Sequence, residues 1–238
     1  MLEDILSDPS SGIDAPAAII LETIQGEGRL NVASAGWLKN VARIAKKFGA
    51  LLIVDDIQAG CSRSGNFFSF ESLEIQPDIV CLAKSISGFG LPMSLVMLKP
   101  EYDISKPGEH NGTFRGNNLA CVTATEAIKN FWSDDTFQNG IQEQVLKTHA
   151  FLKNLVQTYT NFLNIKGRGM MVGLEFSDPA LAKSVQKKIF SESLIIELCG
   201  PHDEVLKLLP PLNVSADQLE KGLRIIATVV HDQLKKRK

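Results

Sequence analysis

The chain has 238 residues, of which 44% are hydrophobic, and its formal net charge is −2. That length and apolar content allow one sizeable core, or one domain plus a smaller one. The balanced charge argues against a nucleic-acid partner, and no apolar run reaches the roughly 20 residues that a membrane-spanning helix needs. We interpret the basic run 235–238 as the solvated end of a helix.

Cysteine usage indicates a reducing compartment. The positions of the four cysteines show no paired spacing and predict no zinc site: Cys61, Cys81, Cys121 and Cys199. No signal-peptide pattern opens the sequence. We therefore expect a cytoplasmic protein without a metal centre.

Three short apolar runs in the first half each end on a charged residue. They are residues 17–21 before Glu22, residues 51–54 before Asp55, and residues 79–83 before Lys84. Such runs predict strands that are buried on both faces. If these strands are parallel neighbours, the three charges lie at the carboxyl edge of one sheet, where open α/β sheets bind their ligands.

The remaining periodicity predicts an α/β fold with a second, smaller domain. An amphipathic stretch over 35–48 predicts a helix that makes a right-handed strand–helix–strand unit with the first two strands. The later predicted elements are a strand turning back at 93–98, helices 118–132 and 136–158, a glycine-spaced strand 167–176, a helix 180–191, strands 194–198 and 205–209, and a closing helix 216–234. We expect a mainly parallel sheet within residues 1–160 and a small α+β domain over 161–238.

Asp55 and Lys84 suit the chemistry of pyridoxal 5'-phosphate. A lysine can form a Schiff base with the cofactor aldehyde, and a carboxylate beside the pyridine nitrogen keeps that nitrogen protonated. Gln58 is placed to hydrogen-bond the ring hydroxyl, and Ile57 to pack against the ring. Taken singly, Asp55 reads as a helix cap and Lys84 as a solvated loop residue; together, each at a strand end, they favour the cofactor site.

These segments resemble the class III (omega) aminotransferases of the fold-type I pyridoxal-phosphate family. The resemblance rests on Asp55-Asp-Ile-Gln58, on Ala83-Lys84-Ser-Ile-Ser-Gly88, on Glu22-Thr-Ile-Gln-Gly-Glu-Gly28 and on His110-Asn-Gly-Thr-Phe-Arg-Gly-Asn117. It implies that Lys84 binds the cofactor covalently and then serves as the general acid and base. It also implies that Thr113 reaches the cofactor phosphate of a partner subunit, hence a homodimer or a higher homo-oligomer; a turn threonine is the alternative.

The resemblance extends to substrate-binding residues. Glu22 and Glu27 lie beside the expected site, and the family often pairs the residue at Glu27 with an arginine that binds a substrate carboxylate. Lys207 stands where that arginine is expected, and a lysine makes a point contact in place of a bidentate fork. Arg168 is a second candidate for the carboxylate, and a structural arginine at a strand edge is its alternative.

Within the family, residues 109–118 look most like the diaminobutyrate–2-oxoglutarate aminotransferases of the ectoine pathway, and so do residues 8–12 and 167–171. That resemblance implies transfer of the terminal amine of L-2,4-diaminobutyrate to 2-oxoglutarate, giving aspartate 4-semialdehyde and glutamate. Ornithine, 4-aminobutyrate and siderophore-type diaminobutyrate aminotransferases share the core motifs and remain alternatives.

The family's phosphate-binding glycine loop and ring-stacking aromatic residue have no match before Glu22. We therefore expect this sequence to be the C-terminal part of such an enzyme, with little activity by itself. A non-catalytic fragment is an alternative from another class. A lysine-dependent lyase without the cofactor is another, and Asp55 with Gln58 argues against it.

Overall fold

The computed structural model describes residues 1–88 and 90–235. Three of the four residues of the basic run that we interpret as a solvated helix end lie outside this part of the chain. The described residues divide into two compact units. Unit 1 contains Met1–Thr23, Ala33–Cys61 and Phe68–Ser133, and unit 2 contains Ile24–Val32, Ser62–Phe67 and Asp134–Lys238.

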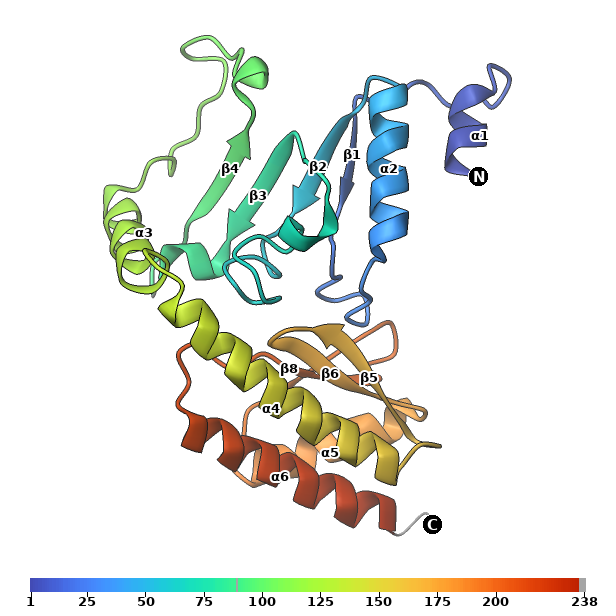
Figure 1. The fold of residues 1–238 in the computed structure, drawn as a ribbon, viewed down its shortest axis with the longest axis vertical. Helices are drawn as coiled ribbons and strands as arrows, with labels where there is room; N and C mark the ends of the chain where they lie inside the picture. Colours follow the sequence, from blue (N-terminus) through green and yellow to red (C-terminus); the bar gives the residue numbers. More distant parts are fainter. Residues whose placement is uncertain (89, 236–238) are drawn as a thin grey trace. The chain divides into compact units, whose positions relative to one another are not determined.

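Unit 1 is built on a four-stranded sheet of order β1-β2-β3-β4. The first three strands are parallel and the fourth runs antiparallel to β3, as predicted for the strand that turns back. Figure 1 shows the arrows of β1, β2 and β3 pointing the same way. The elements of this unit are α1 (Leu2–Ser7), β1 (Ala18–Leu21), α2 (Ala35–Lys47), β2 (Leu51–Asp55), η1 (Glu71–Leu73), β3 (Ile79–Ala83), η2 (Lys84–Ser87), β4 (Ser94–Leu98), η3 (Pro100–Tyr102) and α3 (Asn118–Phe131).

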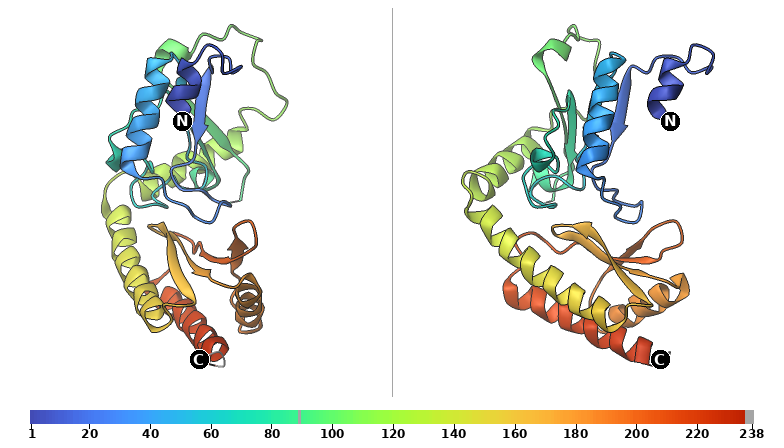
Figure 2. Two further views of the ribbon diagram at one scale, coloured as in Figure 1. Left: turned by 90° about the vertical axis from the view of Figure 1, so that its right-hand side faces the viewer. Right: turned by 45° about the vertical axis from the view of Figure 1, so that its right-hand side comes forward.

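Helix α2 connects β1 to β2 and lies against the sheet in every view (Figures 1 and 2). The Ser34 side chain caps its first turn by accepting a hydrogen bond from the Trp37 amide at 3.2 Å. Gly49, with a φ of 69°, lets the chain leave the helix in the left-handed region. The buried face of α2, which includes Leu38 and Val41, packs with Leu52 and Val54 of β2.

Unit 2 contains an antiparallel sheet of order β5-β6-β8-β7 and three long helices. Helices α4 and α6 run side by side in all the views (Figure 2). The elements of this unit are α4 (Thr136–Thr158), β5 (Leu163–Arg168), β6 (Met171–Phe176), α5 (Pro179–Ser191), β7 (Glu197–Cys199), β8 (Val205–Leu208) and α6 (Ala216–Leu234).

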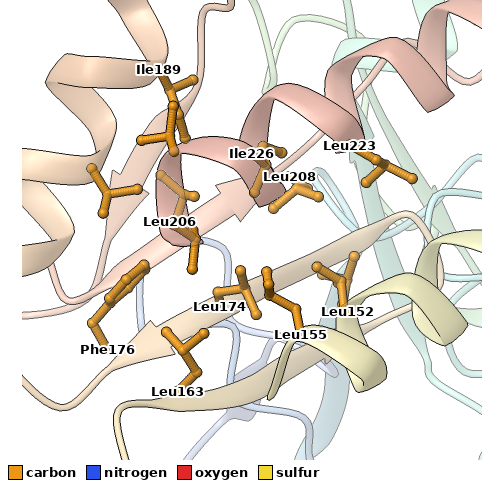
Figure 3. Close-up of a cluster of buried hydrophobic side chains, with 14 of the residues drawn as sticks. Leu152, Leu155, Leu163, Leu174, Phe176, Ile189, Leu206, Leu208, Leu223 and Ile226 are labelled. Atoms are coloured by element: carbon orange, nitrogen blue, oxygen red, sulfur yellow. The ribbon is translucent and has the colours of Figure 1, made fainter. Parts of the chain in front are cut away.

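Leucine, isoleucine and valine side chains from these helices and strands form the larger core (Figure 3). Leu152 and Leu155 of α4 meet Leu174 of β6 and Leu206 of β8 there. Leu174 and Leu206 are fully buried. At about 1.5–3 kcal/mol for each large apolar side chain, this burial is what fastens the helices to the sheet.

Two predictions for this part of the chain were wrong. The single strand predicted over 167–176 is the end of β5, a turn at Gly169 and Met170, and β6, with Gly169 in the left-handed region at a φ of 65°. The strand predicted over 194–198 begins only at Glu197: Ser193 lies in the left-handed region and residues 194–196 are irregular. The predicted domain boundary at residue 160 falls between α4 and β5, both in unit 2, and it stays a prediction.

No helix in the described part of the chain has the length and apolar character to cross a membrane. Among the same residues, no group of three histidine, cysteine or acidic side chains could hold a metal ion.

Candidate active site

Three charged residues lie at the carboxyl edge of the unit 1 sheet, as the sequence predicts. Glu22 directly follows β1, Asp55 ends β2 and Lys84 directly follows β3. The parallel register pairs Leu21 with Val54 and Asp55 with Cys81, so the three strands end close to one another. This is the edge at which open α/β sheets bind ligands.

Asp55 forms the start of a turn beyond β2. Its Oδ1 atom accepts a hydrogen bond from the Ile57 amide at 3.1 Å, so the carboxylate is fixed at the strand end. Burial raises the pKa of the Cys81 thiol, and the negative charge of Asp55 raises it further. The carboxylate therefore acts electrostatically on the neighbouring strand, with one oxygen held by its own turn.

Lys84 has a left-handed backbone, with a φ of 54°, and its side chain is exposed. Non-glycine residues in this region are uncommon and concentrate at functional sites. The lysine opens η2, which is closed by a hydrogen bond from Ser87 Oγ to the Lys84 carbonyl at 3.1 Å. A Cβ atom on Gly88 would lie 3.1 Å from Ala127 Cβ, so the end of η2 packs closely on α3.

Gln58 presents a buried acceptor. Its Oε1 atom is buried and has no hydrogen-bond partner among the residues that the structure describes. A buried amide oxygen left unpaired costs free energy, so a ligand hydroxyl at this position would be favourable. Ile57, beside it in the turn, is half-buried.

A buried polar network behind this turn was missed by sequence reasoning. Asp56 is 1% exposed and accepts a hydrogen bond from the Ser69 amide at 3.0 Å. Ser69 Oγ in turn accepts one from Thr23 Oγ1 at 2.5 Å. These contacts tie the ends of β1 and β2 to the segment that starts at Phe68. No spacing in the sequence indicates this contact, because Thr23 and Ser69 are 46 residues apart.

Thr113 lies in the irregular segment before α3, and its side chain is exposed in this chain. Arg115, two residues on, forms a hydrogen bond with His110 in the same segment. Asn117 caps α3 by accepting from the Leu119 amide at 3.1 Å. The role predicted for Thr113 at the cofactor phosphate of a partner subunit stays a prediction.

Unit 2 brings together the two charged residues that the sequence pairs, Glu27 and Lys207. Lys207 Nζ lies 2.8 Å from Glu27 Oε1 and 3.3 Å from Glu197 Oε2. The lysine stands on β8 between Gly173 of β6 and Glu197 of β7. Its side chain is 1% exposed, whereas that of Glu27 is 76% exposed. Burial alone would lower the pKa of Lys207, but the hydrogen bonds and charges of the two glutamates outweigh it and raise that pKa.

Arg168 ends β5, where it pairs with Met171 in the hairpin. Its Nε atom is buried and the side chain is half-buried. Sequence reasoning did not single out Arg29 or Glu204, which form an ion pair in the same unit. Glu204 directly precedes β8, and no spacing in the sequence indicates its contact with Arg29, because the two residues are 175 apart.

Comparison with known proteins shows which family the sequence matches. The family described as Aminotransferase class-III matches residues 5–230. The chain belongs to the class III aminotransferases. These enzymes depend on pyridoxal phosphate.

Curated class III relatives match nearly the whole chain. A Bordetella parapertussis protein named diaminobutyrate–2-oxoglutarate transaminase is 52% identical over 235 residues, which are 98% of this chain and 54% of that protein. A protein of the same name from Halalkalibacterium halodurans is 53% identical, covering 94% of this chain and 53% of its own length. The chain therefore spans about half the length of these relatives.

Solved class III structures share the fold. The ornithine aminotransferase of Toxoplasma gondii matches 100% of this chain and 55% of its own, with a TM-score of 0.88 and 29% sequence identity. The likeness confirms the predicted fold-type I architecture.

The edge of the unit 1 sheet fits pyridoxal phosphate. An exposed amine at Lys84, a carboxylate at Asp55 and an unpaired buried oxygen at Gln58 are the groups that the aldehyde, the pyridine nitrogen and the ring hydroxyl require. The orphaned Gln58 oxygen is the specific observation, since a purely structural turn would pair it.

Proposed function

We propose that the protein is a pyridoxal-phosphate aminotransferase that moves the terminal amine of L-2,4-diaminobutyrate to 2-oxoglutarate. The products are aspartate 4-semialdehyde and glutamate. The observation that carries this proposal is the identity of 52% and 53%, across almost all of the chain, with relatives named for that reaction. The arrangement of Lys84, Asp55 and Gln58 supports the cofactor assignment.

The residues at the sheet edge divide the chemistry between them. When bound, the cofactor acts as an electron sink for the carbon that carries the migrating amine. The Lys84 amine would hold the cofactor at its aldehyde and would serve as the general acid and base for the migrating proton. Asp55 would keep the pyridine nitrogen protonated, Gln58 would accept a hydrogen bond from the ring hydroxyl and Ile57 would pack on the ring.

We assign to Glu27 and Lys207 the recognition of the substrate groups that do not react. Diaminobutyrate carries an α-ammonium and an α-carboxylate, whereas 2-oxoglutarate has two carboxylates. Glu27 accepts the α-ammonium, and Lys207 binds a carboxylate of 2-oxoglutarate after Glu27 has moved away. The contact between the two residues supports this exchange, because the exposed Glu27 side chain can leave while Glu197 still pairs with the buried cation. Glu22 and Arg168 complete the proposed substrate contacts.

The assembly and setting follow from the same proposal. Thr113 reaches the cofactor phosphate of a partner subunit in a homodimer or larger homo-oligomer, which agrees with its exposed side chain in the single chain. The enzyme works in the cytoplasm, and the reverse direction of the same reaction supplies diaminobutyrate for ectoine biosynthesis. Sedimentation of wild type and Thr113→Arg would test the assembly, since an arginine at an interface should favour monomers.

A substrate competition tests the reaction. The enzyme is offered glutamate with aspartate semialdehyde, glutamate semialdehyde or succinate semialdehyde, and kcat/KM is compared. We expect aspartate semialdehyde to be preferred. Preference for glutamate semialdehyde would instead support the second candidate, an ornithine aminotransferase, the activity for which the Toxoplasma gondii enzyme of the same fold is named. Preference for succinate semialdehyde would indicate a 4-aminobutyrate enzyme.

A further inference from the structure

The turn that carries Glu27 contains two consecutive non-glycine residues in the left-handed region. Arg29 has a φ of 66° and Leu30 a φ of 52°. Side chains with a Cβ atom pay a steric cost there, so such a pair persists only where neighbouring contacts hold it. Contacts with neighbouring residues must therefore stabilise this turn.

The contacts of Arg29 and Leu30 lie within unit 2. Leu30 is fully buried, and its Cδ1 atom is 3.1 Å from where a Cβ atom on Gly173 would lie. The Arg29 guanidinium forms an ion pair with Glu204, and its Nε atom is 3.8 Å from Glu175 Oε1. The Arg29 backbone amide also hydrogen-bonds the Cys199 sulfur, whose pKa burial raises to about 11.

Glu204 is itself fixed. Its side chain is 3% exposed, and its second oxygen accepts a hydrogen bond from the His202 amide at 2.9 Å. A Cβ atom on Gly200 would lie 2.6 Å from that oxygen, so the loop before β8 packs closely against the carboxylate. The Gly200 amide then donates to the Glu27 carbonyl at 3.0 Å. Glu204 is thus linked to the Glu27 backbone from both sides, through Arg29 and through Gly200.

These contacts fix the backbone of Glu27 while its carboxylate pairs with Lys207. An ion pair between preorganised groups is stronger than one between mobile groups, because less conformational entropy is lost when it forms. The turn therefore governs how strongly Glu27 competes with a substrate carboxylate for Lys207. It also governs how well the Glu27 carboxylate is placed for an ammonium group.

We propose that Arg29 and Glu204 are positioning residues that set the balance between the two substrates of this enzyme. By holding the Glu27 turn they favour the amino donor, which uses the Glu27 carboxylate, and disfavour the dicarboxylate, which needs Lys207 freed. The inference rests on the proposed function of Glu27 and Lys207. Neither Arg29 nor Glu204 contacts the substrate in this scheme.

Arg29→Gly is the sharpest variant. Glycine suits a φ of 66° better than arginine, so the substitution relieves backbone strain while removing the ion pair. We expect little net change in the melting temperature, because relief of the backbone strain offsets loss of the ion pair. The KM for diaminobutyrate should rise, and the KM for 2-oxoglutarate should fall, each by about three- to tenfold. The Ki of glutarate, an unreactive dicarboxylate, should fall together with the KM for 2-oxoglutarate. Glu204→Gln should shift all three constants in the same directions.

Matched variants separate a role in positioning the Glu27 turn from a general loss of stability. Arg224→Ala removes an exposed arginine that pairs with Glu220 on α6, and should leave every constant unchanged. In a Lys207→Met background, Arg29→Gly should no longer alter glutarate binding, since the competition for Lys207 is gone. The positioning role would be established if Arg29→Gly shifts the KM values of the two substrates in opposite directions and its effect on glutarate binding disappears in the Lys207→Met background.

Other outcomes overturn it. If both KM values rise together as the melting temperature falls, the pair is structural; if no constant moves by more than twofold, the pair has no role in recognition. If wild type binds neither substrate nor glutarate, the proposed function itself fails. Hydrogen exchange at the amides of residues 26–30 then still tests the turn: unchanged protection in Arg29→Gly would show that Arg29 does not hold it.

Discussion

Lys207 and Glu27 stand 180 residues apart in the sequence, yet Lys207 Nζ lies 2.8 Å from Glu27 Oε1. The pair is asymmetric, because the cation is buried and the carboxylate is exposed. Exposed ion pairs contribute little to stability, whereas a buried cation depends on its partners. In the proposed function the pair recognises substrate, and its two members should therefore respond differently to substitution.

The first prediction concerns Lys207→Met, which keeps the side-chain length and removes the charge. We expect the KM for 2-oxoglutarate to rise by about 10- to 100-fold, the loss expected for one charge-assisted hydrogen bond. The melting temperature should change little, because Glu27 and Glu197 remain hydrated when the lysine is gone. Steady-state kinetics and a thermal scan measure both effects. An unchanged KM would remove Lys207 from substrate recognition.

The second prediction concerns Lys84→Ala. Purified variant enzyme supplied with pyridoxal phosphate should lack the visible absorbance band that borohydride bleaches in wild type, because the amine proposed to bind the aldehyde is gone. Lys46→Ala, at the exposed end of α2, is the matched control and should keep the band. Persistence of a bleachable band in Lys84→Ala would refute the lysine assignment.

The third prediction separates Asp55 from Lys84. In Asp55→Ala we expect turnover to fall by several orders of magnitude while some cofactor stays attached, because Lys84 still binds the aldehyde but the pyridine nitrogen loses its proton. Turnover and bound cofactor are measured on the same preparation, with Asp103→Ala on an exposed loop as control. Near-normal turnover would show that Asp55 has another role.

The fourth prediction uses the acid dependence of stability. Burial would raise the pKa of Glu204, but backbone hydrogen bonds, including that from His202, and the Arg29 guanidinium outweigh it and hold the pKa below its ordinary value of 4.5. A carboxylate with a lowered pKa stabilises the fold above pH 4.5, and that contribution disappears as the pH falls through its folded-state pKa. Urea unfolding of wild type and Glu204→Gln should therefore differ most at neutral pH and converge in acid. A difference that does not vary with pH would contradict the ion pair.

The fifth prediction tests the core of unit 2. Leu206 is fully buried, so Leu206→Ala should lower the free energy of unfolding by about 2–5 kcal/mol through lost burial and a cavity. Leu146→Ala removes a leucine that is 71% exposed and should change it by less than about 0.5 kcal/mol. Chemical denaturation of both variants gives the comparison. Similar losses in the two would mean that Leu206 does not pack as the structure places it.

The parts of the fold that the sequence predicts well depend on local patterns. The runs before Glu22, Asp55 and Lys84 predict the parallel strands because a strand buried on both faces is continuously apolar. The hairpin of β5 and β6 was missed, since two glycines spaced by one residue fit a strand as readily as a turn. Only the positive φ values of Gly167 and Gly169 decide between them.

The site divides in the same way. The residues proposed to bind the cofactor occupy strand ends and short motifs, which are local patterns that a single sequence displays. The Arg29–Glu204 pair and the Thr23–Ser69–Asp56 network join distant segments, and no local pattern encodes their meeting. Contacts between residues far apart in the chain are thus the ones that a single sequence does not predict.

The division of the chain into two units also has a consequence for how the polypeptide acquires its structure. The chain passes from one unit to the other after residues 23, 32, 61, 67 and 133, so no single proteolytic cut yields two complete units. Leu30, fully buried in unit 2, must wait for strands that leave the ribosome far later. Contacts between such distant segments slow folding. During synthesis the early turn therefore lacks the contacts that bury Leu30 in the finished fold.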